Sequence, residues 1–135
     1  MPQVELNIIA VVIATVASMA IGFAWFSPVL FGKAWLGLVG LNEDDAGKGA
    51  ARAMLGSVVA TIVLVLVLSV FIYWAQAEDA AAGALIGLLV WVGFVATTSG
   101  VNFLFSQRPL RLWLIEAGDH LVAIVVAGAI IGVIG

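Results

Sequence analysis

The stretch 53–74, AMLGSVVATIVLVLVLSVFIYW, decides the fold of this chain. Its 22 residues include no charged side chain. An α-helix needs about 20 mostly apolar residues to cross a hydrocarbon core ~30 Å thick. The stretch therefore predicts a transmembrane helix.

Three further apolar runs of comparable length lie on either side of it: Leu6–Phe26, Ala80–Phe105 and Leu112–Ile134. Each is long enough to span a bilayer. The sequence therefore predicts an all-α integral membrane four-helix bundle, with spans at about 6–26, 53–74, 80–105 and 112–134. Residues 1–135 are expected to form a single transmembrane domain.

The composition agrees with a membrane protein and excludes several function classes. Of 135 residues, 64% are hydrophobic and only 10% are charged, whereas a soluble domain is about half apolar and a quarter charged. The absence of cysteine rules out disulfides, thiolate catalysis and cysteine-ligated metals. Five basic residues give almost no electrostatic basis for nucleic-acid binding.

The basic residues also predict how the helices are oriented. All five fall in or beside the first and third connections: Lys33, Lys48, Arg52, Arg108 and Arg111. The second connection holds only Glu78 and Asp79. Because cytoplasmic loops of helical membrane proteins carry an excess of Lys and Arg, the first and third connections should be cytoplasmic and both termini outside.

The connections carry recognisable helix signals. Pro28 follows the first span, and the segment Val29–Leu36 is too short to cross a bilayer, so it should form a short interfacial helix. Asn42–Asp45 reads as an N-cap followed by acidic residues in the first turn of a helix. Pro109 suits the first position of the last helix.

Aromatic residues mark both expected membrane boundaries. Trp25, Trp35 and Trp113 lie at the inner boundary, and Tyr73 and Trp74 at the outer one, where amphipathic rings favour the headgroup level. Trp91 lies mid-span in the third helix. It is expected to be a lipid-facing or core-packing ring.

Each span has small residues at helical spacing, which we call its small-residue seam. The first span has Ala10, Ala14, Ser18 and Gly22; the second has Ala53, Ser57 and Thr61, with Gly56 and Ala60 beside them; the third has Gly83 and Gly87; the fourth has Gly128 and Gly132. Membrane helices associate through close packing at such residues. The seams predict a tight bundle and favour a homo-oligomer.

The fourth span holds the only strongly polar cluster inside an apolar run, namely Glu116, Asp119 and His120. Their spacing of i, i+3 and i+4 places all three on one face of the helix. Asp119 and His120 lie ~15 Å along it, near mid-bilayer. A charge there costs at least ~2.5–3.5 kcal/mol, so these groups should face the interior of the bundle.

Depth in the membrane suggests neighbours for this cluster. Thr98 and Asn102 of the third span lie in the same half of the bilayer. Arg108 and Arg111, together with Lys33, lie at the cytoplasmic mouth, and the arginines could reach Glu116. These residues complete the candidate site.

Four interpretations of the cluster remain open. It could relay protons, since His titrates near neutral pH. It could recognise the polar group of a lipid or another apolar ligand. It could contribute to a metal site, although one chain offers a single nitrogen ligand and no second Glu-x-x-His, so no metal or cofactor is expected. It could also serve only to fix the register of the helices through hydrogen bonds.

Two sequence blocks resemble a known family. The first runs from Gly22 to Trp35 and contains Trp25-Phe26-Ser27-Pro28 and Phe31-Gly32-Lys33-Ala34-Trp35. The second contains Trp91–Ala96, Arg108-Pro109 and Gly118. Together they resemble domain of unknown function 1761, a family of small bacterial four-helix membrane proteins. The resemblance implies a multi-pass protein of the bacterial cytoplasmic (inner) membrane and no particular activity. It departs at Phe26, where the family often has tyrosine.

These observations favour a non-enzymatic membrane protein that acts as an oligomer or accessory subunit. It would bind lipid, a hydrophobic ligand or partner helices. The main alternative is a small proton-coupled transporter or channel that uses Asp119 and His120. A third is a membrane enzyme that works at the cytoplasmic mouth with Glu116, Asp119 and His120, although no catalytic motif is present.

Overall fold

The computed structural model describes residues 5–40 and 49–135, and within these ranges the chain is helical with short turns and no strand. The helices are α1 (Ile8–Trp25), α2 (Gly32–Val39), α4 (Ala50–Ala75), α5 (Ala80–Val90), η1 (Trp91–Ala96), α6 (Thr97–Ser106) and α7 (Leu110–Ile134). The segments α5, η1 and α6 follow one another without a break, so Ala80–Ser106 is one long helix. Among the described residues, four helices are long and apolar enough to cross a membrane, which confirms the predicted all-α membrane protein.

Two elements begin a few residues away from where the sequence predicts them. Pro109 has an extended backbone, with φ −61° and ψ 140°, so it caps α7 from outside rather than occupying its first turn. The short helix occupies Gly32–Val39 instead of Val29–Leu36, because Pro28 and its neighbours form a tight turn first. The predicted cap at Asn42–Asp45 lies outside the described residues.

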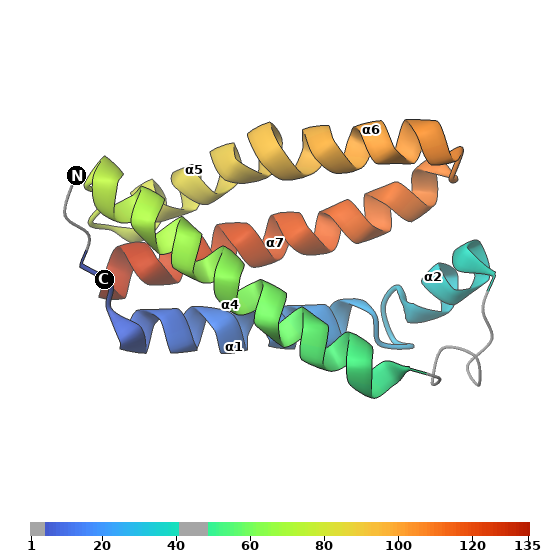
Figure 1. Ribbon diagram of the computed structural model, residues 1–135, viewed down its shortest axis with the longest axis horizontal. Helices are drawn as coiled ribbons and strands as arrows, with labels where there is room; N and C mark the ends of the chain where they lie inside the picture. Colours follow the sequence, from blue (N-terminus) through green and yellow to red (C-terminus); the bar gives the residue numbers. More distant parts are fainter. Residues whose placement is uncertain (1–4, 41–48) are drawn as a thin grey trace.

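Helix α7 forms the centre of the bundle (Figure 1). It packs against α1, α4 and α5, and it contributes more buried residues than any other helix. A core cluster lies where α1, α4 and α7 meet, and its most deeply buried members include Ala14, Val65, Leu68 and Ile124. The chain therefore wraps three other spans around its last one.

The small-residue seams of α5 and α7 face each other. A Cβ atom added to Gly83 would lie 2.0 Å from the Gly128 carbonyl oxygen, and one added to Gly132 would lie 2.3 Å from that of Asp79. Neither position has room for any side chain. The glycines of α5 and α7 therefore pack against each other within the chain, so they are not available for contacts between chains.

One end of the bundle brings the first and last spans together. The Asn7 side chain caps α1 by accepting hydrogen bonds from the Ile9 and Ala10 amides at 3.0 and 3.2 Å. Its Nδ2 also donates to the Ile134 carbonyl at 3.4 Å. The start of α1 and the end of α7 thus meet at the end of the bundle opposite α2 (Figure 1).

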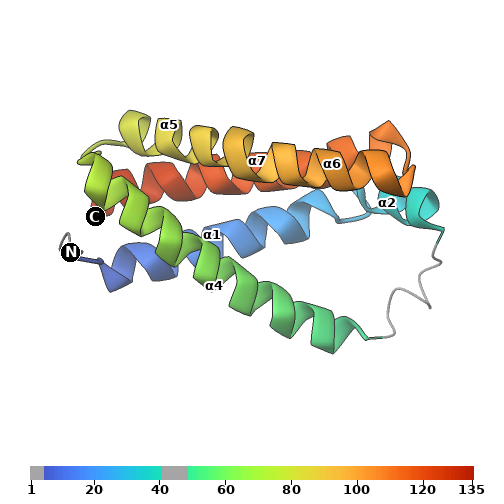
Figure 2. The same cartoon turned by 45° about the horizontal axis from the view of Figure 1, so that its top comes forward.

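Helix α4 crosses the others obliquely, so that its two halves differ. Its second half is packed, with Val65, Leu68 and Ile72 buried. Its first half, from Ala50 to Ser57, is exposed throughout. Figures 1 and 2 show the start of α4 lying well away from α6 at the α2 end of the bundle. The bundle is therefore splayed at the α2 end, and its helices lie closer together at the opposite end, which we call the closed end and which holds a smaller hollow of about 520 Å³.

Candidate ligand-binding site

The chain makes a compact elbow between α1 and α2. The Phe31 amide donates to the Trp25 carbonyl at 3.0 Å, and the Gly32 amide donates to the Ser27 carbonyl at 2.9 Å. A Cβ atom on Gly32 would lie 2.3 Å from the Phe26 carbonyl oxygen, so only glycine fits the turn. The elbow turns the chain sharply and aims α2 back at the bundle.

Trp35 uses this elbow to reach α7. Its Nε1–H donates to Glu116 Oε2 at 3.1 Å, and its ring stands edge-on to that of Phe26. Arg108 Nη2 approaches the two carboxylate oxygens of Glu116 at 3.2 and 3.3 Å. Glu116 therefore has two partners, and α2, α7 and the turn before α7 are tied together at one carboxylate.

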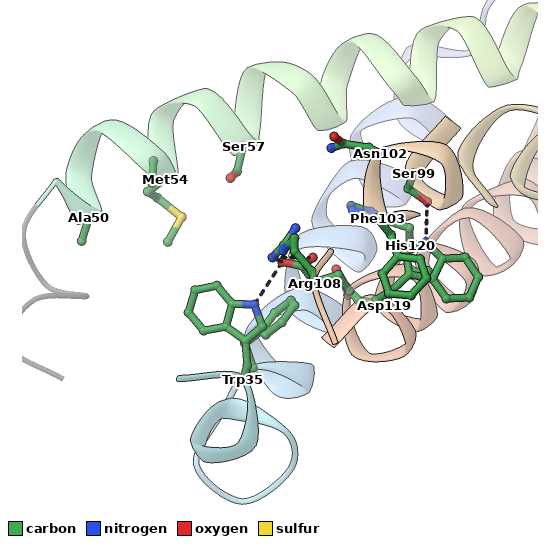
Figure 3. A pocket seen from close by; sticks show the side chains of 15 residues that line it. Trp35, Ala50, Met54, Ser57, Ser99, Asn102, Phe103, Arg108, Asp119 and His120 are labelled. Carbon is green, nitrogen blue, oxygen red and sulfur yellow. Dashed lines mark hydrogen bonds and ion pairs between the residues drawn. The ribbon is translucent and has the colours of Figure 1, made fainter. Parts of the chain in front are cut away.

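Above this carboxylate lies a cavity of about 730 Å³, which we call the central cavity (Figure 3). Helix α4 forms one wall, α6 another, and α7 forms the floor. The lining residues are Phe26, Trp35, Ala50, Ala53, Met54, Ser57, Ser99, Asn102, Phe103, Arg108, Trp113, Glu116, Ala117, Asp119 and His120. The cavity exists because the first half of α4 stays apart from α6.

Asp119 lies on the floor of the central cavity. Its side chain is only 9% exposed, and its Oδ1 has no hydrogen-bond partner among the described residues. Neighbouring His120 is exposed and also lines the cavity. Buried polar atoms nearly always have a partner, so an orphaned carboxylate oxygen needs an explanation.

A second hollow of about 430 Å³ lies on the other side, between α1 and α4. It shares Phe26, Met54, Ser57, Asp119 and His120 with the central cavity. Gly22 lines this hollow next to Asp119, and a Cβ added to it would be in van der Waals contact with Oδ1, at 3.9 Å. Asp119 and His120 therefore sit where the two hollows meet beneath α4.

Two tryptophans hold the part of α7 that carries these groups. Trp25 Nε1–H donates to the Ile115 carbonyl at 2.8 Å, and Trp91 Nε1–H donates to the Ala117 carbonyl at 3.0 Å. Gly118 makes room for the Trp25 ring, since a Cβ there would lie 2.9 Å from Trp25 Cζ2. The bonds come from opposite sides, α1 and η1, and fix the backbone that positions Glu116 and Asp119.

The profile of one family, described as a protein of unknown function (DUF1761), matches residues 9–132. The chain belongs to this family. The match contains both the elbow and the α7 segment that it braces. Searches of curated proteins and of solved structures found no match.

In this DUF1761 protein, the structure gathers most of the residues singled out in the sequence. Glu116, Asp119, His120 and Asn102 all line the central cavity, and so do Arg108 and Trp35. Trp25 lies behind the floor, while Ser27 closes the elbow by donating from Oγ to the Ala24 carbonyl at 2.7 Å. Pro28 is exposed within the turn.

Three other candidates lie elsewhere. Thr98, Arg111 and Lys33 are exposed and are not part of the cavity lining. Thr98 precedes Ser99 in α6, and the turn of about 100° between consecutive helical residues directs it away from the cavity that Ser99 lines. The basic pair Arg108 and Arg111 is therefore split, and only Arg108 reaches Glu116.

The cavity also has walls that the sequence did not reveal. Met54 comes from α4, and Ser99 and Phe103 come from α6. Trp113, predicted at the membrane boundary, donates from Nε1 to Ser99 Oγ at 3.0 Å and packs against Phe103. Their role depends on the splay of α4, for which the sequence carries no signal.

The site offers carboxylates and one imidazole, but their arrangement does not form a metal centre. No group of three or more His, Asp or Glu side chains is placed to hold an ion within residues 5–40 and 49–135. Glu116 is already occupied by Arg108 and Trp35. What the arrangement can do is surround a molecule that has an apolar body and one polar group.

Proposed function

We propose that this DUF1761 protein is a non-enzymatic membrane protein that binds a lipid or another hydrophobic ligand in the central cavity. The observation that carries the proposal is the orphaned Oδ1 of Asp119 at the floor of a cavity of about 730 Å³. Ligand pockets have volumes of roughly 300–1,000 Å³ and combine apolar walls with a few polar groups. Asp119 is such a group.

The cavity suits a ligand that arrives from the bilayer. Its wall on α4 consists of Ala50, Ala53, Met54 and Ser57, all of which are exposed. Phe26 and Phe103 add apolar surface on the other sides. An apolar chain could enter sideways between α4 and α6 without crossing water.

We further propose that the α2 end of the bundle faces the cytoplasm, in the inner membrane of a bacterium. Lys33, Arg52, Arg108 and Arg111 lie at this end, in keeping with the positive-inside rule. The cavity would then open toward the inner leaflet.

The second part of the proposal is self-association or membership of a larger complex. The α5–α7 seam is occupied, but Gly56 in the first half of α4 is not: it lines neither hollow, and a Cβ added there would meet nothing within 4 Å. Close packing against another membrane helix would use this surface.

Proton-coupled transport remains the alternative function, and Asp119 and His120 at the meeting point of two hollows favour it. A continuous path, however, would have to cross the core cluster, where Ala14, Val65, Leu68 and Ile124 are at most 1% exposed. Transport therefore needs a second conformation, whereas binding needs only this one. Proton-linked flux in reconstituted vesicles that disappears in Asp119→Asn would favour transport.

Native mass spectrometry of the protein, extracted gently from its own membranes, tests the binding function. We expect a stoichiometric apolar molecule on the chain and its loss in Ser57→Trp, which fills the cavity from α4. A protein that carries nothing in either form contradicts the proposal. The same spectrum reports a homo-oligomer or a bound partner.

A further inference from the structure

We propose that the central cavity selects a cationic amphiphile, an apolar molecule with an ammonium head group, whose charge is met by Asp119. This inference rests on the proposed function and names the class of ligand. Three features of the described residues carry it: the orphaned carboxylate oxygen of Asp119, the pairing of Arg108, the only arginine or lysine in the lining, with Glu116, and two aromatic pairs.

The two carboxylates of the cavity are not equally paired. Its lining holds one permanently charged cation, Arg108, the carboxylates of Glu116 and Asp119, and the imidazole of His120. Arg108 and Glu116 neutralise each other at 3.2 Å. His120 is next to Asp119 but is exposed, and no described residue bonds to Asp119 Oδ1, so this buried carboxylate lacks the close ion pair that Glu116 has.

A buried carboxylate in the membrane is costly unless it has a partner. A cation from the ligand would supply the missing counter-charge beside Asp119, which lines the cavity. An anionic head group fits poorly, because it would face Asp119 while the guanidinium of Arg108 is already held by Glu116.

Aromatic rings strengthen the same preference. Phe26 and Trp35 line the cavity on the α2 side, with ring centroids 5.6 Å apart. Phe103 and Trp113 line it on the α6 and α7 side, with centroids 6.0 Å apart. Ring faces attract cations, and alkylated ammonium groups are commonly bound in aromatic surroundings. The carboxylate of Asp119 and these rings share one cavity lining, and Figure 3 shows Asp119, Trp35 and Phe103 among the side chains around it, so we assign the cation site to this part of the cavity.

The test compares probes that share one apolar chain and differ only in head group. The protein in lipid nanodiscs is dialysed against decyltrimethylammonium, decanol or decanoate, and empty nanodiscs give the background. We expect the ammonium probe to bind best, and Asp119→Asn to weaken it by at least about tenfold, a change of about 1.4 kcal/mol. Decanol binding should not change in Asp119→Asn, which also shows that the variant is folded.

Two controls separate this inference from the function on which it rests. Glu78→Gln, an exposed acid at the opposite end of the bundle, should leave all three affinities unchanged. Ser57→Trp should abolish binding of every probe. If decanoate binds as tightly as the ammonium, or Asp119→Asn leaves ammonium binding intact, the cation preference is wrong and the apolar site stands. If none of the probes binds above background, both fail.

Discussion

At the scale of single residues, Asp119 is the position where stability and function conflict. Its carboxylate is buried, yet Oδ1 forms no hydrogen bond among the described residues. Burying an unpaired polar group typically costs about 1–3 kcal/mol. Proteins retain such a cost where the group serves a ligand.

Replacing this side chain with an apolar one of similar size should therefore stabilise the empty protein. We expect Asp119→Leu to raise the free energy of unfolding by about 1–3 kcal/mol, measured by equilibrium unfolding in mixed micelles. Asp79→Ala is the contrasting variant: Asp79 caps α5 by accepting from the Ala82 amide at 2.7 Å, so its loss should cost about 0.5–2 kcal/mol. A clear loss of stability in Asp119→Leu would mean that the carboxylate has a structural role.

The polar residues of α7 could be predicted as part of the site, whereas the hydrogen-bond partners of the tryptophans could not. The spacing of Glu116, Asp119 and His120 predicted a shared face, and all three line the cavity. The sequence predicts Trp25 and Trp35 at a membrane boundary, but it does not reveal that both donate hydrogen bonds to α7. In the sequence, a tryptophan near a helix end looks the same whether its indole contacts lipid headgroups or donates to a neighbouring helix. Only the packed structure shows the hydrogen-bond partner.

At the scale of helices, the glycines of α5 and α7 are the strictest packing requirement. Gly83→Ala places a Cβ where the Gly128 carbonyl already lies, so α5 must move away from α7. Overpacking of this kind costs typically about 1–3 kcal/mol, and we expect a loss of at least that size. Gly100→Ala, in α6 of the same span, meets nothing within 4 Å and should stabilise by about 0.4–1 kcal/mol. Equal effects of the two substitutions on thermal unfolding would contradict this packing.

The lengths of the apolar runs were enough to predict the four spans. They were not enough to predict irregular turns within a span, such as the π-helix η1. Trp91 and Ser99 lie eight positions apart, yet both make hydrogen bonds with residues of α7. A regular α-helix would turn them apart, whereas the wider turns of η1 take up the difference. Apolar composition does not distinguish a π-helix from an α-helix, so this register could not be predicted.

The two halves of α4 should also differ in mobility. Spin labels at Ser57 and Asn102, which line the central cavity from opposite walls, should give a broad distance distribution that narrows when ligand binds. Labels at Tyr73 and Leu85, both exposed near the packed end of the bundle, should give a narrow one in either state. Double electron–electron resonance measures both. Similar widths for the two pairs would mean that the first half of α4 is held as firmly as the second.

At the scale of the whole molecule, the ends of the bundle differ in charge as well as in packing. The splayed end carries Lys33, Arg52, Arg108 and Arg111, whereas the closed end has acidic residues such as Glu78 and Asp79. Only the splayed end contains the cavity with Asp119. Orientation in the membrane therefore also decides the leaflet from which a ligand would enter.

Because the chain has no cysteine, this orientation can be measured with single introduced thiols. Lys33 and Glu78 are both exposed, at opposite ends of the bundle. The positive-inside rule predicts that, in intact cells, a membrane-impermeant maleimide labels Glu78→Cys but not Lys33→Cys. After permeabilisation it should label both, which controls for reactivity. The reverse pattern would place the cavity in the outer leaflet, and cationic ligands would then have to reach Asp119 from outside the cell.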